Sequence, residues 1–197
     1  MSGLIERLFE RMYHIEPLVP DAADIALRLA FRVYRGPGFR LSDGTQVRRG
    51  DRVVELHLSN ERVARLHRDH DDIRRIGLAY AVLLMHSLRA LADAWPSEAR
   101  FEDVVAAYGV SIFPEQAGPG RFEVRELCPA WRRRLLSWWI RRVVAHAHPQ
   151  GSGRVIARDG TPREVTELWM SRAQCLANWG KESGTHKHLG ESRGRET

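Results

Sequence analysis

The sequence predicts a single α+β domain in which a small, mostly antiparallel sheet packs with two long helices and short N- and C-terminal helices. Short segments of alternating apolar and polar residues are interspersed with longer segments whose apolar residues recur every three or four positions. Turn residues separate these segments. The 197 residues, 43% of them hydrophobic, suit one globular domain. We expect this domain over residues 1–179, followed by a disordered polar tail over residues 180–197.

Alternation predicts the strands and the turns between them. Strands are expected at 25–33, 52–58, 122–127 and 164–170, with an extended segment at 110–113 and a hairpin at 39–48 around an Asp-Gly turn. Within the strand at 52–58, Val53, Glu55 and His57 share one face, because successive side chains of a strand point to opposite sides.

Helical periodicity predicts the remaining elements. Helices are expected at 3–15, at 73–95 before Pro96, at 98–108, from Pro129 to 147, and at 172–179 after a Ser171 cap. Either Ser59 or Asn60 can cap a further helix. The stretch 76–85 is apolar on all sides, so we expect it to be the buried element around which the domain packs.

The charge balance is basic but spread along the chain. Lys and Arg number 31 against 25 Asp and Glu, and the only lysines are Lys181 and Lys187. Arginine forks bind phosphate and carboxylate, but the even spread favours the codon bias of a GC-rich genome as the explanation. The net charge of +6 therefore indicates a mild preference for anionic partners.

Cellular location follows from what the chain lacks. No uninterrupted apolar run approaches the ~18 residues of a spanning helix, and charges interrupt the apolar positions near the N-terminus, unlike a secretory signal. We expect a cytoplasmic protein that is free or peripheral to the inner membrane. Cys128 and Cys175 lack metal-like spacing, so buried reduced thiols are expected, with a single disulfide as the alternative.

His57 and Asn60 form the first candidate site, at the end of the strand at 52–58. Histidine suits proton transfer near neutral pH, and asparagine can orient or polarise a substrate. The alternative is ordinary structure, with His57 as a partly buried strand residue and Asn60 as a helix cap. A second cluster, His67 and His70 beside carboxylates, could bind a divalent ion, but a solvated helix start explains it more simply. No metal and no cofactor are expected.

The helix after Pro129 is rich in Trp and Arg. A helical wheel places Leu135, Leu136, Trp139, Ile140, Val143 and Val144 on the apolar face, with Arg134, Ser137 and Arg141 opposite. We assign phosphate or anion binding to Arg132, Arg133, Arg134 and Arg141. Membrane or partner contact is assigned to Trp131, Trp138 and Trp139. Three interpretations remain open for this helix: a core helix with solvated arginines, a membrane-interface helix, and a nucleic-acid contact.

The order of the motifs resembles the YkoP-like domain family. The run from Leu41 through Asp43-Gly44-Thr45 and Gly50-Asp51 to His57 and Asn60 carries the start of this resemblance. Further matching pieces are Tyr108-Gly109-Val110, Phe122-Glu123-Val124, the Pro129-Ala130-Trp131-Arg132 entry into the Trp-rich helix, His148-Pro149 with Gly151, and Leu168-Trp169 before Ser171-Arg172. The resemblance implies a bacterial protein that occurs alone or fused to polysaccharide deacetylases, with a role near cell-envelope glycans or glycolipids. It implies no established reaction.

These observations lead to one expected function and two alternatives. We expect an accessory domain that contacts a phosphate-bearing glycolipid or an envelope enzyme, such as a polysaccharide deacetylase or glycosyltransferase, at the inner face of the membrane. The first alternative is a small enzyme acting on a sugar or lipid-linked sugar with His57 as general base. The second is a nucleic-acid-binding protein, which no Gly-rich phosphate loop or recognised nucleic-acid fold supports.

Overall fold

The computed structural model describes residues 13–70, 72–112, 121–127, 129–147, 156 and 160–180. Within these ranges the side chains of residues 60, 73, 139 and 143–147 are left out of the description. The helix predicted at 3–15 lies outside the described residues except for its last three positions. The predicted polar tail lies outside them after Gly180.

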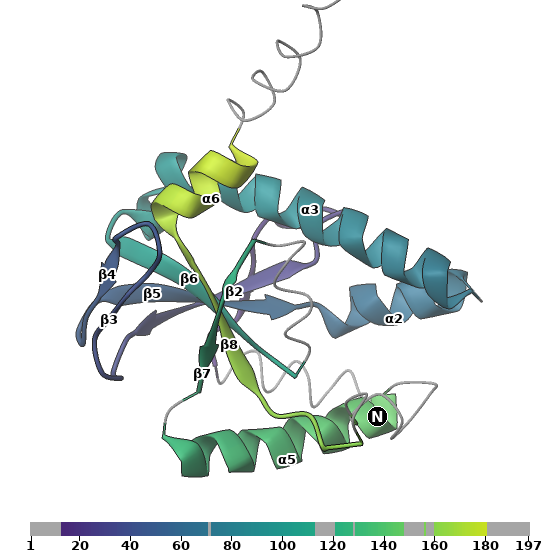
Figure 1. Ribbon diagram of the computed structural model, residues 1–197. Coiled ribbons are helices and arrows are strands. Elements are labelled where there is room, and N and C mark those ends of the chain that lie inside the picture. The colour runs from purple at the N-terminus through teal and green to yellow at the C-terminus, as the bar shows by residue number, and fades with distance from the viewer. Residues whose placement is uncertain are drawn as a thin grey trace, which may run out of the picture.

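A six-stranded sheet forms the centre of the molecule (Figure 1). Its strand order is β1-β2-β5-β6-β8-β7, with bounds Glu16–Pro17, Leu27–Val33, Arg52–Leu58, Val104–Ser111, Thr166–Ser171 and Glu123–Glu126. Of these neighbouring pairs, β5 and β6 run parallel and the other four are antiparallel. A separate hairpin consists of β3, Phe39–Arg40, and β4, Gln46–Val47. The predicted α+β class, with a mostly antiparallel sheet, is confirmed.

Helices lie on both sides of this sheet. They are α2 (Asn60–Asp69), α3 (Ile73–Ser97), α5 (Ala130–Ala147) and α6 (Arg172–Trp179), with a short 3-10 helix η1 at Ala99–Phe101. Figure 1 shows α3 and α6 on one side of the sheet and α5 on the other. The helices α2, α3 and η1 lie between β5 and β6 in the chain. They form the long crossover connection that two parallel neighbouring strands require.

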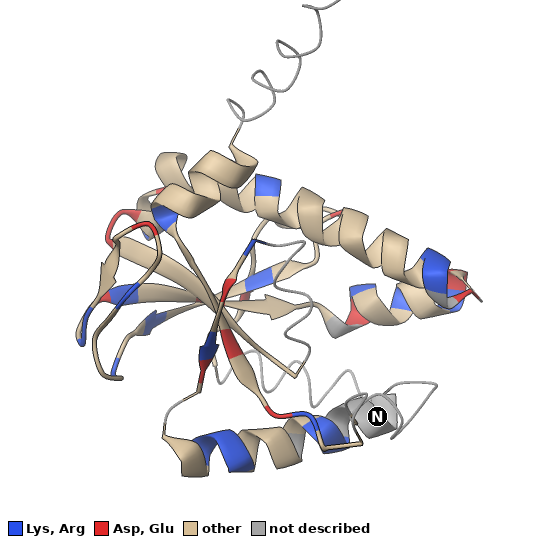
Figure 2. Cartoon of the chain, in the orientation of Figure 1, with Lys and Arg blue, Asp and Glu red and all other residues tan. Residues whose placement is uncertain are grey.

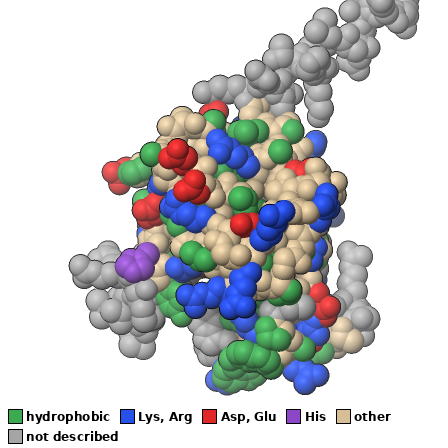
Figure 3. All heavy atoms as spheres, turned by 90° about the vertical axis from the view of Figure 1, so that its left-hand side faces the viewer, with side chains coloured by type: hydrophobic (Ala, Val, Ile, Leu, Met, Phe, Trp, Pro, Cys, Tyr) green, Lys and Arg blue, Asp and Glu red, His purple; other side chains and the backbone are tan. Residues whose placement is uncertain are grey.

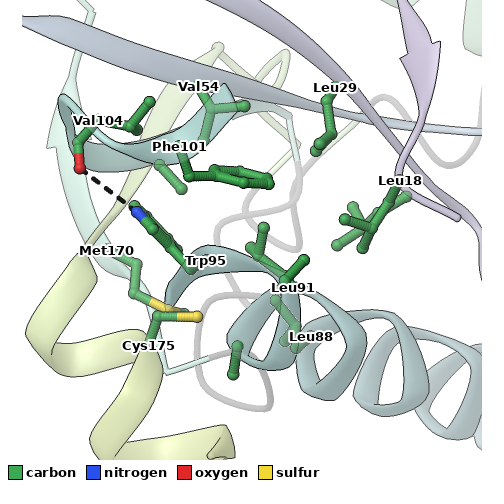
Figure 4. Packing of buried hydrophobic residues seen from close by; sticks show 14 of the residues in the cluster. Leu18, Leu29, Val54, Leu88, Leu91, Trp95, Phe101, Val104, Met170 and Cys175 are labelled. Carbon is green, nitrogen blue, oxygen red and sulfur yellow. Dashed lines mark hydrogen bonds between the residues drawn. The ribbon is translucent and has the colours of Figure 1, made fainter. Parts of the chain in front are cut away.

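The main core lies between α3 and the sheet (Figure 4). Trp95 is 1% exposed, and its indole N–H donates to the Val104 carbonyl at 3.3 Å. The Phe101 ring meets the ring of Phe31 edge-on, with centroids 5.4 Å apart. Cys175 lies in the same cluster, and burial raises the pKa of its thiol to about 12. The thiol is therefore protonated at neutral pH.

The prediction that 76–85 is the buried part of α3 is wrong. Leu78 is 69% and Val82 is 38% exposed, whereas the buried stretch begins at Leu84 and continues to Trp95. A 25-residue helix is about 37 Å long, so α3 extends past the sheet, and its first half lies beside α2 (Figure 1). Pro96 lies inside the last turn, since the helix ends at Ser97.

Among the described helices, α3 is long and apolar enough to cross a bilayer by length and composition alone. Its mean hydropathy is 1.3 over the most apolar window of Arg74–Ser97, and 28% of that window is buried. Core helices of globular domains reach the same length and mean hydropathy, and the second half of α3 packs in the core.

The short helix predicted at 98–108 is also wrong. The structure has one 3-10 turn at Ala99–Phe101 and then β6 at Val104–Ser111. Pairing with β5 on one side and β8 on the other satisfies the backbone of this segment, and the small residues Ala106 and Ala107 are fully buried. Tertiary pairing has therefore overridden the local helical preference.

The predicted caps and turns are confirmed. Gly44 and Gly50 have φ angles of 89° and 99°, which favour glycine at both turns. Ser59 caps α2, and Ser171 forms a reciprocal capping box with Gln174 at the start of α6. The Ser171 hydroxyl also donates to the Asp43 carboxylate, so the cap ties the β3–β4 turn to α6.

Replacing Ser171 with alanine tests this junction. Ser171→Ala removes the acceptor for the Gln174 amide and the donor to Asp43. We expect the free energy of unfolding to fall by about 1–3 kcal/mol. The measurement is urea-induced unfolding followed by circular dichroism.

Ser97→Ala is the matched control. The Ser97 hydroxyl donates to the Asp93 carbonyl within its own helix and caps no helix start. A loss of less than about 0.5 kcal/mol is expected. Equal losses in the two variants would contradict the structural role of the Ser171 cap.

Candidate functional site

The face of the sheet opposite α3 carries a row of ionisable side chains. Cross-strand pairing puts Arg28 beside His57 and Glu55 beside Tyr108. Directly opposed residues share a face, so these groups line one side of the sheet. We call this surface the polar face and define it by Arg28, Arg32, Glu55, His57, Tyr108, Arg125 and Glu167.

Glu55 and His57 form the centre of the polar face, both partly buried. The His57 Nε2 atom lies 3.7 Å from Glu55 Oε1, and Arg32 Nε donates to Glu55 Oε2 at 3.2 Å. Burial raises the pKa of Glu55, but the nearby imidazole of His57 and the charge and hydrogen bond of Arg32 outweigh it and lower the pKa overall. An ionised carboxylate beside an imidazole can orient the ring for proton transfer or ligand binding.

Tyr108 and Glu167 extend this cluster across β6 and β8. Burial raises the pKa of Tyr108, and the neighbouring Glu55 carboxylate raises it further, so the hydroxyl remains a donor. Burial also raises the pKa of Glu167, against the opposing effects of a hydrogen bond from Trp169 and the charges of Arg132 and Arg125. The Trp169 indole N–H donates to Glu167 Oε2 at 2.9 Å.

Arg132 connects α5 with the polar face. Its positive charge acts to lower the pKa of both Tyr108 and Glu167. The structure thus brings together two regions that are far apart in the chain, the His57 strand and the start of the Trp-rich helix. Figure 2 shows acidic and basic positions along β7, β8 and α5.

The β3–β4 hairpin borders the polar face on another side. Trp169 is fully buried, and the rings of Phe39 and Tyr34 pack edge-on against it at 4.9 and 5.6 Å. Tyr108 stacks on the same indole at 4.7 Å. The Arg125 guanidinium lies 3.9 Å from the centroid of the Phe39 ring. These contacts hold the hairpin against the sheet.

The outward face of α5 differs from the predicted wheel. Leu135, predicted to be on the apolar packing face, is 58% exposed, and Ser137, predicted opposite, is 1% exposed. The Ser137 hydroxyl accepts from the Val165 amide at 2.9 Å, so a polar group faces inward because it satisfies a buried backbone donor. Leu136 and Ile140 pack inward as predicted.

Two exposed indoles accompany Leu135. Trp131 is 67% and Trp138 is 51% exposed, and the spacing 131, 135, 138 places all three residues on one side of α5. Figure 3 shows hydrophobic side chains gathered at the lower end of the molecule, where α5 lies, with basic side chains beside them. We call Trp131, Arg134, Leu135, Trp138 and Arg142 the outer face of α5.

The four predicted anion-binding arginines divide into two pairs. Arg133 forms ion pairs with Glu126 and with Glu164, and Arg141 donates to the Arg163 carbonyl at 2.9 Å. Arg132 and Arg134 are exposed. The side chains of Asn60 and Trp139 lie outside the described residues, so their predicted roles stay predictions.

The described part of the chain contains no group of three or more His, Cys, Asp or Glu side chains placed to hold a metal ion. The predicted pair His67 and His70 lies in α2 and at its C-terminal cap. The groups that can contact a ligand on the polar face are thus guanidinium, imidazole, phenol and carboxylate groups.

Comparison with protein families gives a match over most of the chain. The YkoP domain matches residues 2–179, from before β1 to the end of α6. The chain belongs to the YkoP domain family. The resemblance seen in the motifs is therefore confirmed. No curated protein and no solved structure gives a significant match.

In this YkoP domain, several members of the polar face were absent from the sequence-based site. Glu55 was placed on the His57 side of its strand but given no role, and Tyr108, Arg125 and Glu167 were not selected. Alternation was a usable signal for Arg125 in β7 and Glu167 in β8, whereas Tyr108 fell within the segment predicted as a helix. These residues could not be joined to His57 without the strand order, in which a crossover places β6 beside β5 and β8 then pairs with β6.

Removing the Glu55 carboxylate tests the charge arrangement of the YkoP polar face. Because folding lowers its pKa below the ordinary value of 4.5, Glu55 contributes stability above that value and loses it as pH falls through the folded pKa. Glu55→Gln should lower the free energy of unfolding at pH 7 by about 1–3 kcal/mol. It should also make the stability less dependent on pH as the pH falls from 7 to below 4.5. Urea unfolding at several pH values measures both effects.

Glu61→Gln is the control for this experiment. Glu61 makes an exposed ion pair with Arg65 one helical turn away. Its removal should change the free energy of unfolding by less than about 0.5 kcal/mol. A Glu55→Gln protein with unchanged stability at pH 7 and unchanged pH dependence would refute the proposed electrostatic role.

Proposed function

We propose that this YkoP domain binds peripherally to the inner face of the bacterial membrane, where it recognises a phosphate-bearing glycolipid. The observation that carries the proposal is the outer face of α5. There, two indoles and a leucine are each more than half exposed, in a helix whose other side packs against the sheet.

The composition of that face fits a lipid interface. Indole rings favour the depth of lipid headgroups, where one edge meets hydrocarbon and the other meets water. Arg134 and Arg142 lie on the same side, and the Arg142 guanidinium lies 5.0 Å over the Trp138 ring. Guanidinium groups bind phosphate through paired hydrogen bonds. The outer face of α5 therefore carries indole rings that match the apolar part of a lipid interface and guanidinium groups that match its phosphates.

The polar face supports recognition of the headgroup. Arg132 is exposed at the start of α5, and its charge acts on the pKa of both Tyr108 and Glu167. A phosphate held by Arg132 would place attached sugar hydroxyls toward phenol, carboxylate and imidazole groups that can donate and accept hydrogen bonds. The link that the family resemblance implies to envelope glycans agrees with this ligand class.

Vesicle flotation tests the lipid part of the proposal. Vesicles of phosphatidylcholine with phosphatidylglycerol should bind the wild-type protein, and vesicles of phosphatidylcholine alone should bind it more weakly. The double variant Trp131→Ala/Trp138→Ala should bind about tenfold more weakly or worse, since losing two interfacial indoles removes more than the ~1.4 kcal/mol of a tenfold change.

A charge-matched pair supplies the control. Arg134→Glu should weaken binding to the anionic vesicles, whereas Arg89→Glu, the same charge change on α3 across the sheet, should have a smaller effect. Equal binding of wild type and both α5 variants would refute the membrane role. If the protein does not bind vesicles but captures a deacetylase or glycosyltransferase, and this capture requires Trp131 and Trp138, then the outer face of α5 is assigned to a protein partner.

The Glu55–His57 pair supports a second candidate function, an enzyme that acts on a sugar or lipid-linked sugar with His57 as general base. His57 does not lie in an apolar core, since its side chain is 29% exposed and the Glu55 carboxylate lies 3.7 Å away. A carboxylate beside a partly exposed imidazole is a common arrangement in general-base catalysis.

A thermal-shift screen against sugar phosphates and nucleotide sugars tests this candidate. A ligand at 100 times its Kd stabilises the folded state by about 2.7 kcal/mol, which raises the melting temperature. The shift should disappear in His57→Gln and persist in His67→Gln, a histidine in α2. Turnover of the shifting compound by wild type but not by His57→Gln would establish an enzyme. A shift that both variants retain would exclude His57 from the site.

A further inference from the structure

A groove between α2 and α3 lies apart from both surfaces described above. Its volume is about 510 Å³, and its walls include Leu66 of α2 and Leu78, Ala79 and Val82 of α3. These α3 residues belong to the half of the helix that extends past the sheet. An apolar groove of this kind on the surface of a domain is typical of an interaction site.

The groove residues of α3 recur at helical spacing. Arg75, Ala79, Val82 and His86 are three or four positions apart, so they lie along one side of the helix and face the groove together.

The two ends of the groove carry opposite charges. Arg75 lines it near the start of α3, and Asp24 and His86 line the other end. The Asp24 carboxylate is 3.5 Å from His86 Nδ1, and its side chain is 68% exposed. Residues 75 and 86 are separated by about 16 Å along the helix. No Asp, Glu, Lys or Arg occurs from Ile76 to Leu88, and Figure 2 shows this stretch uncharged.

From these features we infer that the groove binds a second copy of the same chain. The two α3 helices would pack antiparallel about a two-fold axis near residues 80–81. That position is midway between the charged ends, so Arg75 of each copy meets Asp24 of the other. A two-fold interface must be complementary to itself, and opposite charges at the two ends of an apolar strip satisfy this condition.

The contact is short, so the dimer is reversible. It spans about three helical turns between residues 75 and 86, which is at the small end of specific interfaces. We expect a Kd on the order of micromolar. The inference does not depend on the proposed function, because α5 lies on the opposite side of the sheet (Figure 1).

Sedimentation velocity of the full chain over a range of concentrations tests the dimer. Wild type should shift from monomer to dimer as concentration rises. Arg75→Asp and Asp24→Arg should each weaken dimerisation about tenfold or more, because each places like charges opposite one another across the axis. The double variant Arg75→Asp/Asp24→Arg should restore dimerisation, since the pairs are re-formed with exchanged signs.

Leu78→Glu and Trp131→Ala/Trp138→Ala complete the experiment. Leu78 is exposed in the monomer, so Leu78→Glu should leave the circular dichroism spectrum unchanged and abolish the dimer. The α5 variant should dimerise like wild type, which separates this inference from the membrane proposal. The inference is overturned if wild type is monomeric at all concentrations or if the charge-exchanged double variant fails to dimerise. If the wild type does not dimerise and Leu78→Glu no longer binds anionic vesicles, the groove is instead assigned to the membrane.

Discussion

The packing of the second half of α3 across the sheet is the constraint on which the rest of the structure depends. The Trp95 indole donates to the Val104 carbonyl, which fixes the end of the crossover against the first residue of β6. The crossover lets β6 run parallel to β5, and this pairing puts Tyr108 beside Glu55. Because α3 covers one face of the sheet, the ionisable residues lie together on the other face, between the β3–β4 hairpin and α5. Core packing on one side therefore determines the composition of the candidate site on the other.

Local patterns predicted most elements of the fold, because alternation, caps and turn glycines act within a few residues of the chain. The strands β2, β5, β7 and β8, the hairpin and α6 all follow from such patterns. The incorrect predictions concern segments whose structure depends on contacts with residues far away in the sequence. Uniform apolarity at 76–85 could not show which half of α3 reaches the sheet. At 104–111 the two flanking strands supply the pairing that converts a helical pattern into β6.

The candidate site was predictable only in part. His57 and the arginines of α5 stood out because their residue types are chemically distinctive, but Glu55, Tyr108 and Glu167 join them only through a strand order that the chain does not reveal locally. The orientation of α5 depends on Ser137, whose hydroxyl meets the Val165 amide. A hydrophobicity wheel places serine outside, since it does not take account of a buried backbone donor in another segment.

The two outermost strands of the sheet have a consequence for how this protein meets other molecules. β1 has two residues, and three of the four residues of β7 are charged. A short outer strand offers few free backbone groups to an incoming strand, and charged side chains on an outer strand oppose pairing. The four inner strands are paired on both sides. Growth of the sheet by strand addition, the usual first step toward fibrils, is therefore disfavoured. Recognition by this domain is left to side chains on helices and on the open sheet surface.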